Sequence, residues 1–542
     1  MSVKKYGIYL AYPPTINLQG QGLGHHLAEF LKAAQDRKDI CFVIACPSWM
    51  RSSLIELFKD ANIKQEYFEV LAPCRKPAPL LIYEQLTSSK IALKGKALVT
   101  NNLQNLEKST ASLRTKLERW EAKKRKNKSS LRLRIAGLFF FLINQYLFKF
   151  FFRLLTDYSF MTNPKDDMIV CMLYMKMRSR EVKLMNKLIN LRSDVEAWYC
   201  PTAFWPEFHE IQAPRLMCVP DVVMVNCPIS FARVSNRRLL DNFRQIEKSI
   251  AGSEYCVTYS EDVKWNTLVK HYHMDPDNIS VVPHGVKSIK NHINFSGDFS
   301  RNEDFLIKFC NTTMKIIMSR STNALNYYLF GNDSNIKFIF YASQFRPNKN
   351  IISLLKAYDY LLKRQYINHK LILTGDPQVL PEINDFIKRH NLENEVLCLH
   401  GLSTRELTAC YKLADLAVNP SLSEGGCPFT LTEALSVDTP VVMARIPVTL
   451  EVIRDPDLDK EMLFDPYDWK DMADRIEWAL QNKEALLAKQ KLLYSVLEKR
   501  TWRTVVDEYI NILDKISHKD LMITHPLPKK MSRKKALKKD AA

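Results

Sequence analysis

The stretch LAVNPSLSEGGCPFTLTEALSVDTPVVMA, residues 416–444, holds a complete strand, loop, helix and strand. Its two ends, LAVN and VVMA, are short apolar runs of the kind found in buried strands. A polar turn with Gly425 and Gly426 follows the first run, and a helix is expected to start near Pro428, because proline fits the first helical turn. Two parallel strands joined by a helix form one unit of an α/β fold.

The same order of elements recurs along most of the chain. Ahead of residue 416, strands are expected at FIFYA, LILTGD and VLCLHG, with a helix over 350–364. Near the N-terminus, GIYLAY, the glycine loop QGQGLG, the helix HHLAEFLKAAQ and CFVIACP repeat the pattern, and AWYCP, VVMVNCP and YCVTYS are expected to continue it as strands. The sequence therefore predicts two Rossmann-like domains whose strands end at a shared cleft, where a ligand should bind.

This pattern divides the chain of 542 residues into five parts. Residues 1–325 form the N-terminal domain, within which 84–164 are a basic and amphipathic insert. Residues 326–500 form the C-terminal domain, 501–517 a helix that is expected to cross back to the first domain, and 518–542 a basic tail with a composition typical of disorder.

The net charge of +19 raises the possibility of a nucleic-acid partner. Its distribution argues against that partner, because the excess is concentrated in two segments. Residues 88–134 hold fourteen Lys and Arg against three Glu, and residues 518–542 hold eight against two Asp. The basic run KKRKNKSSLRLR also lacks the aromatic side chains on which bases stack.

A long apolar run, IAGLFFFLINQYLFKFFFRLL at residues 135–155, follows the first basic segment. It is long enough to span a bilayer, but spanning would put strands of one sheet on opposite sides of the membrane. Gln145, Lys149 and Arg153 form a polar stripe every four residues, so a helix lying in the membrane interface is favoured, with residues 119–155 and the tail drawn to anionic lipid. A buried core helix or a dimer contact is the alternative.

The cysteines and the N-terminus indicate a reducing, cytoplasmic location. None of the twelve cysteines forms a C-x-x-C pair, and most lie in apolar runs, as buried thiols do. The start MSVKKYGIYLAYPP has no small-residue cleavage site and is expected to be a first strand, not a signal peptide.

Charged residues in the second domain fall directly after expected strands. Arg346 and Lys349 follow FIFYA and precede a helix, an arrangement that suits a diphosphate. Glu424 follows LAVN, and Glu433 lies further along the next helix. Carboxylates accept hydrogen bonds from paired sugar hydroxyls. Taken one at a time, each of these residues is explained equally well as a solvated or helix-stabilising side chain; their joint position favours a site.

The C-terminal part resembles a retaining family 4 glycosyltransferase of the GT-B fold. EGGCPFTLTEALSVDTPVV is similar to that family's Glu-Gly-x-Gly-x-Pro…Glu-Ala…Gly-Thr-Pro-Val-Val signature, and ISVVPHGV to its VIPNGV segment. SQFRPNKN is closest to the version in the mannosyltransferase that extends lipid-linked oligosaccharides on the cytoplasmic face of the endoplasmic reticulum. The resemblance covers roughly residues 6–50 and 195–516 and leaves out the insert.

The resemblance implies a role for each matched position. Arg346 and Lys349 would hold the donor diphosphate, Glu433 the ribose hydroxyls, and Glu424 with the loop after it the transferred sugar. A glycine-rich turn of the first domain would close over the phosphates, and the turn after VLCLH would contact the base. These further donor-binding positions are Gly22, Gly24, Gly401, Leu402, Gly425, Gly426, Cys427, Pro428 and Phe429.

Some positions depart from the family pattern. Eight residues separate the two glutamates where seven are usual, and Asp438 replaces a glycine, although aspartate tolerates a left-handed backbone. The family's His-Asp pair has no clear match: CVPD offers Asp221 without a histidine, and His209 or the adjacent His25 and His26 are weak substitutes because a lone histidine is more often structural.

No essential metal is expected. The D-x-D pattern in DPDN, with Asp275 and Asp277, is explained better by a turn before the strand ISVV than by a metal site. No cofactor other than the nucleotide-sugar donor, GDP- or UDP-linked, is implied.

The function expected is a hexosyltransferase, mannose favoured, that works on the inner, cytoplasmic face of a membrane as a peripheral protein. Its acceptor would be a lipid-linked glycan or a polysaccharide. A membrane-tethered binding protein that kept the GT-B fold but lost turnover is the alternative, which the altered glutamate spacing makes conceivable.

Overall fold

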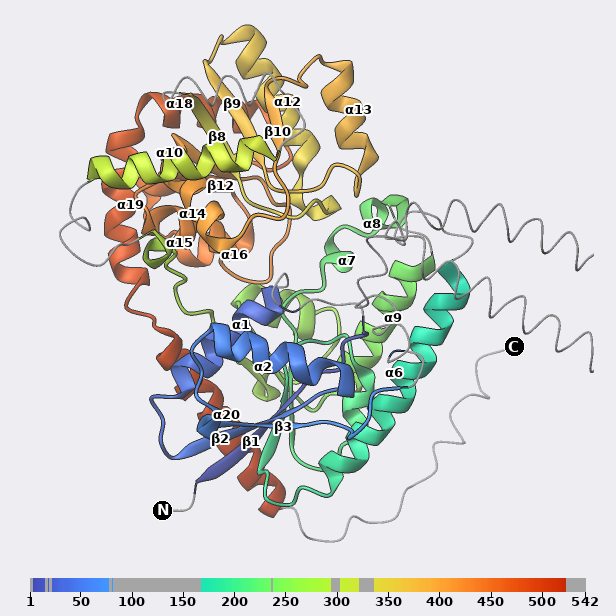
Figure 1. Ribbon diagram of the computed structural model, residues 1–542. Helices are drawn as coiled ribbons and strands as arrows, with labels where there is room; N and C mark the ends of the chain where they lie inside the picture. The colour runs from blue at the N-terminus through green and yellow to red at the C-terminus, as the bar shows by residue number, and fades with distance from the viewer. Residues whose placement is uncertain are drawn as a thin grey trace, which may run out of the picture.

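The computed structural model describes residues 3–14, 18, 22–77, 80, 167–234, 237–293, 303–320 and 336–522. The whole insert at 84–164, including the 135–155 segment, and almost all of the tail lie outside this part of the chain. Two lobes are visible, with the N-terminal elements in one and the elements from α10 to α19 in the other (Figure 1).

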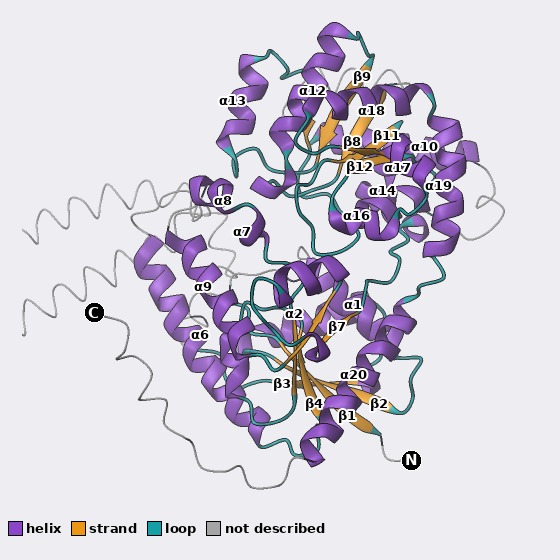
Figure 2. Ribbon diagram, turned by 180° about the vertical axis from the view of Figure 1, so that it is seen from behind, coloured by secondary structure: helices purple, strands orange, loops and turns teal. Residues whose placement is uncertain are grey.

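The first lobe is built on a parallel sheet with the strand order β3-β2-β1-β4-β5-β6-β7 among the described residues. Helices lie on both faces of this sheet (Figure 2). The elements are β1 (Lys4–Tyr9), α1 (Gly22–Ala34), β2 (Ile40–Ala45), α2 (Arg51–Asp60), β3 (Phe68–Leu71), α6 (Asp167–Asn190), β4 (Ala197–Cys200), β5 (Arg215–Cys218), α7 (Val223–Asn226), α8 (Pro228–Val234), α9 (Arg237–Gly252), β6 (Tyr255–Thr258), a π-helical segment (Val263–Val269) and β7 (Ile279–Val281).

The second lobe has a parallel sheet with the order β10-β9-β8-β11-β12-β13. The elements are α10 (Glu303–Ser319), β8 (Lys337–Tyr341), α12 (Ile351–Arg364), β9 (His369–Leu373), α13 (Pro381–Arg389), β10 (Val396–Cys398), α14 (Thr404–Leu413), β11 (Leu416–Asn419), α15 (Phe429–Ser436), β12 (Val441–Ala444), α16 (Pro447–Val452), α17 (Pro456–Met462), β13 (Leu463–Phe464), α18 (Trp469–Gln481) and α19 (Lys483–Leu497).

Two parallel sheets, each covered by helices, confirm the predicted α/β fold of two Rossmann-like domains. Each sheet contributes to its own apolar core. Ile289 and α10 belong to the second core, so the cores divide the chain between Val282 and Ile289, earlier than the sequence-based boundary at 325.

The last helix, α20 (Trp502–Met522), returns to the first lobe. Val505, Tyr509 and Leu513 are fully buried in the first core, and the Tyr509 ring packs edge-on against Tyr199 of β4. The chain therefore crosses between the lobes twice, once in each direction.

One predicted strand is wrong. VVMVNCP, residues 222–228, contains the short helix α7, and the strand in this region is β5, immediately before it. β5 pairs directly with β6, so the sheet has no place for another strand between them. An apolar run of four residues suits a short helix as well as a strand.

Candidate active site

The two strands that carry the candidate residues are neighbours in the second sheet. β8 pairs with β11, and the strand order reverses between them, because β9 and β10 continue to one side while β12 and β13 lie on the other. Lys349 follows β8 and Glu424 follows β11. Ligands of open parallel sheets bind where such a reversal occurs, outside the carboxyl ends of the strands.

Lys349 and Glu424 form an ion pair at this position, through Nζ and Oε1. Their side chains are 19% and 15% exposed, so the pair is largely removed from water. Burial would lower the pKa of Lys349, but the negative charge of Glu424 and its neighbours outweighs it and the pKa lies above its ordinary value. The ammonium therefore stays charged at neutral pH, as a diphosphate-binding cation must.

Asn348 holds the two loops of this pair together. Its buried side chain donates to the Ser423 carbonyl at 3.0 Å, and its backbone carbonyl accepts from the Leu422 amide at 2.8 Å. The loop after β8 and the loop after β11 are thus fixed to one another.

Asp221 approaches this ion pair from the other lobe. It follows β5, three residues beyond Cys218. Burial, and then the negative charge of Glu424, raise the pKa of the Asp221 carboxyl, while Lys349 and Arg346 act in the opposite direction. A Cβ built on Gly425 would lie 3.2 Å from the Asp221 Cβ, so Asp221 lies beside the loop that follows Glu424.

The loop after β11 also touches the first lobe through its backbone. A Cβ on Gly425 would lie 2.0 Å from the carbonyl oxygen of Pro220, so only glycine allows this approach. The Gly425 carbonyl accepts a hydrogen bond from the Ser260 hydroxyl at 2.9 Å, and Asn226 donates to the Ser423 hydroxyl at 3.0 Å. Gly426 packs on Tyr259. The two lobes are in direct contact beside the candidate site.

Glu433 has a partner that sequence reasoning missed. Its Oε1 lies 2.5 Å from Nζ of Lys287, in the segment that links the lobes after β7, and both side chains are mostly buried. The Lys287 ammonium is also 5.7 Å from the centre of the Phe429 ring. Two residues later, the amide of Ile289 donates to the Ser436 hydroxyl at 3.2 Å. The linker is therefore attached to α15 at two points.

An aromatic cluster lies next to this linker. The ring of His284 packs against Tyr259, Phe429, His26 and Trp502, with centroids 3.8, 5.0, 5.4 and 5.9 Å away. Burial lowers the pKa of His26 to about 4 and also places the pKa of His284 well below its ordinary value. Both rings are therefore neutral at pH 7.

The other candidates occupy different positions. Arg346 is exposed and donates to Gln344 at 3.0 Å, close enough to Asp221 to affect its pKa. Gly401 has φ of +72° at the end of edge strand β10, two strands from β8, and Leu402 is half-buried beside it.

Gly22 and Gly24 lie in the first turn of α1, not in the loop that the sequence predicted before the helix. A Cβ on Gly24 would lie 1.9 Å from the Leu18 carbonyl oxygen, whereas a Cβ on Gly22 would meet no atom of the described residues within 4 Å. Gly24 is thus required by packing, while Gly22 is exposed.

Cys427 and Pro428 complete the loop before α15. Burial, and then the charge of Glu424, raise the pKa of the Cys427 thiol to about 12, so it stays protonated. The helix begins at Phe429, as expected from Pro428.

Two other sequence candidates have structural roles. His209 Nε2 lies 2.9 Å from the Ser249 carbonyl, and the ring packs against Gly252, away from the ion pair. Asp275 accepts from the Asp277 amide at 3.0 Å, which confirms the turn. The His25 side chain is not among those described.

Within the described part of the chain, no group of three or more His, Cys, Asp and Glu side chains is placed to hold a metal ion. The cysteines described there are all free thiols. No helix among the described residues is long and apolar enough to cross a membrane.

Comparison with known proteins identifies the class of the second lobe. Residues 330–491 match the family of glycosyl transferases group 1. The chain is also 25% identical over 191 residues to an uncharacterized glycosyltransferase of Methanocaldococcus jannaschii, a match that covers 34% of this chain and 46% of that protein. The matched stretch thus spans about half of the relative. Over residues 330–491 the second lobe is thus similar to glycosyl transferases of group 1, and this similarity supports a transferase enzyme.

Solved structures extend the similarity to both lobes. A glycosyltransferase from Rickettsia africae superimposes with a TM-score of 0.53 at 12% identity, over 95% of this chain and 99% of that one. Anabaena HepE, in complex with UDP and glucose, gives 0.51 at 12% identity over 94% and 100%. At this identity the likeness concerns the fold alone, which is the GT-B fold of a two-domain glycosyltransferase.

Proposed function

We propose that this protein is a retaining glycosyltransferase that moves a hexose, mannose favoured, from a UDP- or GDP-linked donor to a lipid-linked or polysaccharide acceptor. The observation that carries this proposal is the Lys349–Glu424 ion pair at the strand-order reversal of the second sheet, beside the loop where Gly425 meets Pro220 and Asp221 of the other lobe. A UDP-linked donor gains support from HepE, which has the same fold and binds UDP and glucose.

In the proposed reaction, the bond between sugar C1 and the diphosphate oxygen breaks as the acceptor oxygen bonds to C1 from the same face. Lys349 and Arg346 bind the departing diphosphate and stabilise its charge without a metal ion. The acceptor hydroxyl loses its proton to the leaving phosphate oxygen. Glu424 and the loop Gly425–Phe429 hold the sugar hydroxyls, and Asp221 faces them from the acceptor side.

Three further positions would contact the rest of the donor. Glu433 would accept hydrogen bonds from the ribose hydroxyls while Lys287 keeps its carboxylate in place. Gly22, exposed in the first turn of α1, would close over the phosphates from the first lobe, and the turn at Gly401 and Leu402 would contact the base.

We place the protein on the cytoplasmic face of a membrane, held by residues 119–155 and the basic tail. The amphipathic pattern of residues 135–155 and the fourteen Lys and Arg of residues 88–134 support this location.

The test is a thermal-shift panel of the purified protein with GDP, UDP, ADP and their common sugar conjugates, without metal and with magnesium. A ligand at about 100 times its Kd stabilises the native state by roughly 2.7 kcal/mol. One nucleotide should stand out, and it should do so equally in Lys176→Gln, a surface control. No shift with any nucleotide would count against the donor site.

A non-catalytic GT-B binding protein is the second candidate. It rests on the eight residues between Glu424 and Glu433 and on the engagement of Glu433 by Lys287. Such a protein would bind a nucleotide-sugar but release no nucleotide from it over hours, whereas the proposed enzyme would hydrolyse or transfer the sugar.

A further inference from the structure

Helix α6 is held to the first lobe along one of its faces. The Arg178 guanidinium donates to both carboxylate oxygens of Glu207, at 2.7 and 3.0 Å, and the Glu181 carboxylate accepts from the amide of Ser48 at 2.9 Å. The buried apolar residues of this face are Val182, Met185 and Ile189. The inner face of α6 is therefore fully used in packing.

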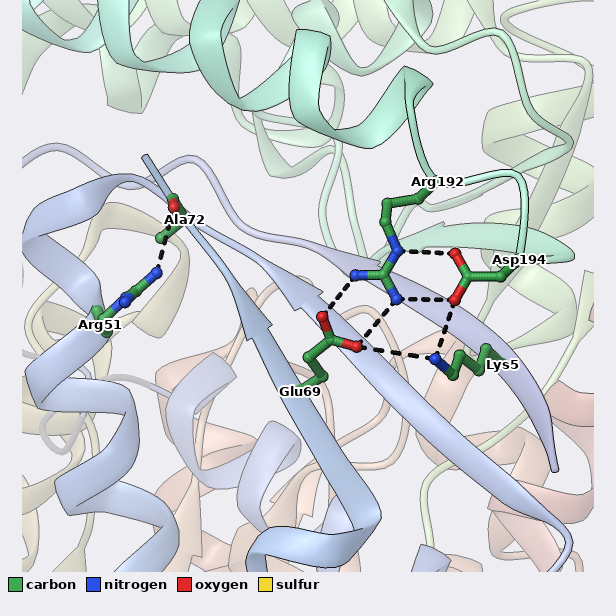
Figure 3. A network of polar contacts seen from close by, with 6 residues as sticks. All are labelled: Lys5, Arg51, Glu69, Ala72, Arg192 and Asp194. Atoms are coloured by element: carbon green, nitrogen blue, oxygen red, sulfur yellow. Dashed lines mark hydrogen bonds and ion pairs between the residues drawn. The ribbon is translucent and has the colours of Figure 1, made fainter. Parts of the chain in front are cut away.

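The end of α6 is fixed as well. Arg192, two residues past the helix, donates to Glu69 of β3 at 2.5 and 2.9 Å and to Asp194 at 2.7 and 2.9 Å, and Asp194 also pairs with Lys5 of β1 (Figure 3). This network joins the end of α6 to two strands and opposes rotation of the helix about its axis. The same face of α6 therefore points away from the sheet.

That outer face carries a basic stripe, which consists of Lys176, Arg180, Lys183 and Lys187. Their spacings of four, three and four residues keep them within about 60° around the helix. All four are exposed. Among the described residues, no acidic side chain forms an ion pair with any of them, in contrast to the paired Arg178 and Arg192.

Two apolar side chains lie beside the basic stripe. Leu184 is 40% exposed and Leu191, just past the helix, is 78% exposed. Basic side chains with exposed leucines between them suit a lipid surface, where the ammonium groups meet headgroups and the leucines enter the boundary with the acyl chains. A nucleic acid would instead call for aromatic stacking groups, which this face lacks.

The charge of the two basic segments does not suit the basic stripe. The two charged segments outside the lobes, residues 88–134 and 518–542, have the same sign and would be repelled. The apolar run at 135–155 ends twelve residues before α6 begins, so at most about 40 Å of extended chain separates them. A membrane that receives that run is within reach of α6.

We propose that the outer face of α6 is a docking surface for a membrane that contains anionic phospholipid. This inference shares the membrane location with the proposed function but does not depend on sugar transfer. The docking surface belongs to a folded helix, whereas the insert and the tail are the segments that the proposed function places at the membrane.

The test compares two variants of the full chain with equal loss of charge. One replaces the basic stripe, as Lys176→Gln, Arg180→Gln, Lys183→Gln and Lys187→Gln. The control replaces four exposed basic residues on α12 and α13 of the other lobe, as Lys356→Gln, Arg364→Gln, Lys388→Gln and Arg389→Gln. Partitioning is measured by flotation with vesicles of phosphatidylcholine, alone and mixed with phosphatidylglycerol.

Each basic side chain near an anionic surface changes partitioning roughly fivefold. If two or more of the four reach the lipid, the stripe variant should bind the mixed vesicles at least about 25-fold more weakly, and the control should bind like the wild type. Equal binding by the two variants would overturn the proposal, because it would leave membrane contact to the other segments or to net charge alone.

A competition experiment distinguishes a lipid surface from other acidic partners of the basic stripe. Polyuridylate and poly-glutamate are added to the wild-type protein on mixed vesicles. If either one displaces the protein and binds the stripe variant weakly, the basic stripe is a site for nucleic acid or acidic protein, and a lipid surface is refuted. UDP-induced thermal shifts are measured in parallel. Their absence in all variants would count against the donor site and leave the docking result intact.

Discussion

The Lys349–Glu424 pair predicts an asymmetric response to mutation. Lys349→Met leaves the Glu424 carboxylate without its partner in a mostly buried place, where the nearby Asp221 carboxyl adds to the negative potential. After Glu424→Gln, the electrostatic attraction of Asp221 still favours the charged lysine. Breaking a buried pair costs about 3 to 5 kcal/mol. We expect Lys349→Met to lower the free energy of unfolding by about 3 kcal/mol, the low end of that range, because the pair is partly exposed. Glu424→Gln should lower it by about 1 kcal/mol.

Calorimetry and urea unfolding measure this difference. For domains of this size, 1 kcal/mol corresponds to about 2 to 4 °C in Tm, so Lys349→Met should melt roughly 6 to 12 °C lower. Adding Glu424→Gln to Lys349→Met should restore part of the loss, because it removes the unpaired charge of Glu424. The pair of the exposed Lys489 with Glu461 is the control, and Lys489→Met should leave Tm nearly unchanged, because water screens this charge.

Nucleotide-sugar turnover is measured on the same proteins. Both single variants and the double variant should lose about 100-fold or more in kcat/KM, since each lacks a charged contact to the donor. Equal destabilisation by the two single substitutions would refute the electrostatic effect of Asp221 on the lysine. Wild-type turnover in Lys349→Met would refute the site itself.

Three further perturbations test other parts of the site. Lys287→Met should weaken nucleotide binding about tenfold by calorimetric titration, with partial rescue by Lys287→Arg and no added loss with Glu433→Gln, if the two residues act as a pair. Gly425→Ala should lower turnover at least about tenfold with little change in Tm, because the new Cβ displaces the Pro220 carbonyl and parts the lobes; unchanged turnover would contradict that contact. The pKa of His26 is lowered from 6.5 to about 4, so the unfolded state binds more protons in this range and stability falls as the pH drops from about 6.5 to 4, by up to about 3 kcal/mol. His26→Phe should make urea unfolding less acid-sensitive between pH 7 and 5, and an unchanged pH dependence would exclude that histidine as its source.

The local parts of the fold could be predicted from sequence. α15 starts after Pro428, as expected, and Asp438 takes the left-handed φ of +63° that the replacement of glycine required. These features depend on a few adjacent residues, whose backbone preferences do not change with distant packing. The prediction was wrong for residues 222–228 because whether a short apolar run becomes a strand depends on a free position in the sheet.

The sequence by itself determined the two parallel α/β domains and the order in which Lys349, Glu424 and Glu433 follow their strands, because hydrophobic periodicity and turn residues are local signals. Only the tertiary structure brought Asp221 to Gly425 and Lys287 to Glu433, across more than a hundred residues of sequence. The physical reason is that these contacts arise where two separately folded cores meet. Their geometry follows from how the lobes pack, through contacts such as that of Gly425 with Pro220, and no short stretch of the chain encodes it.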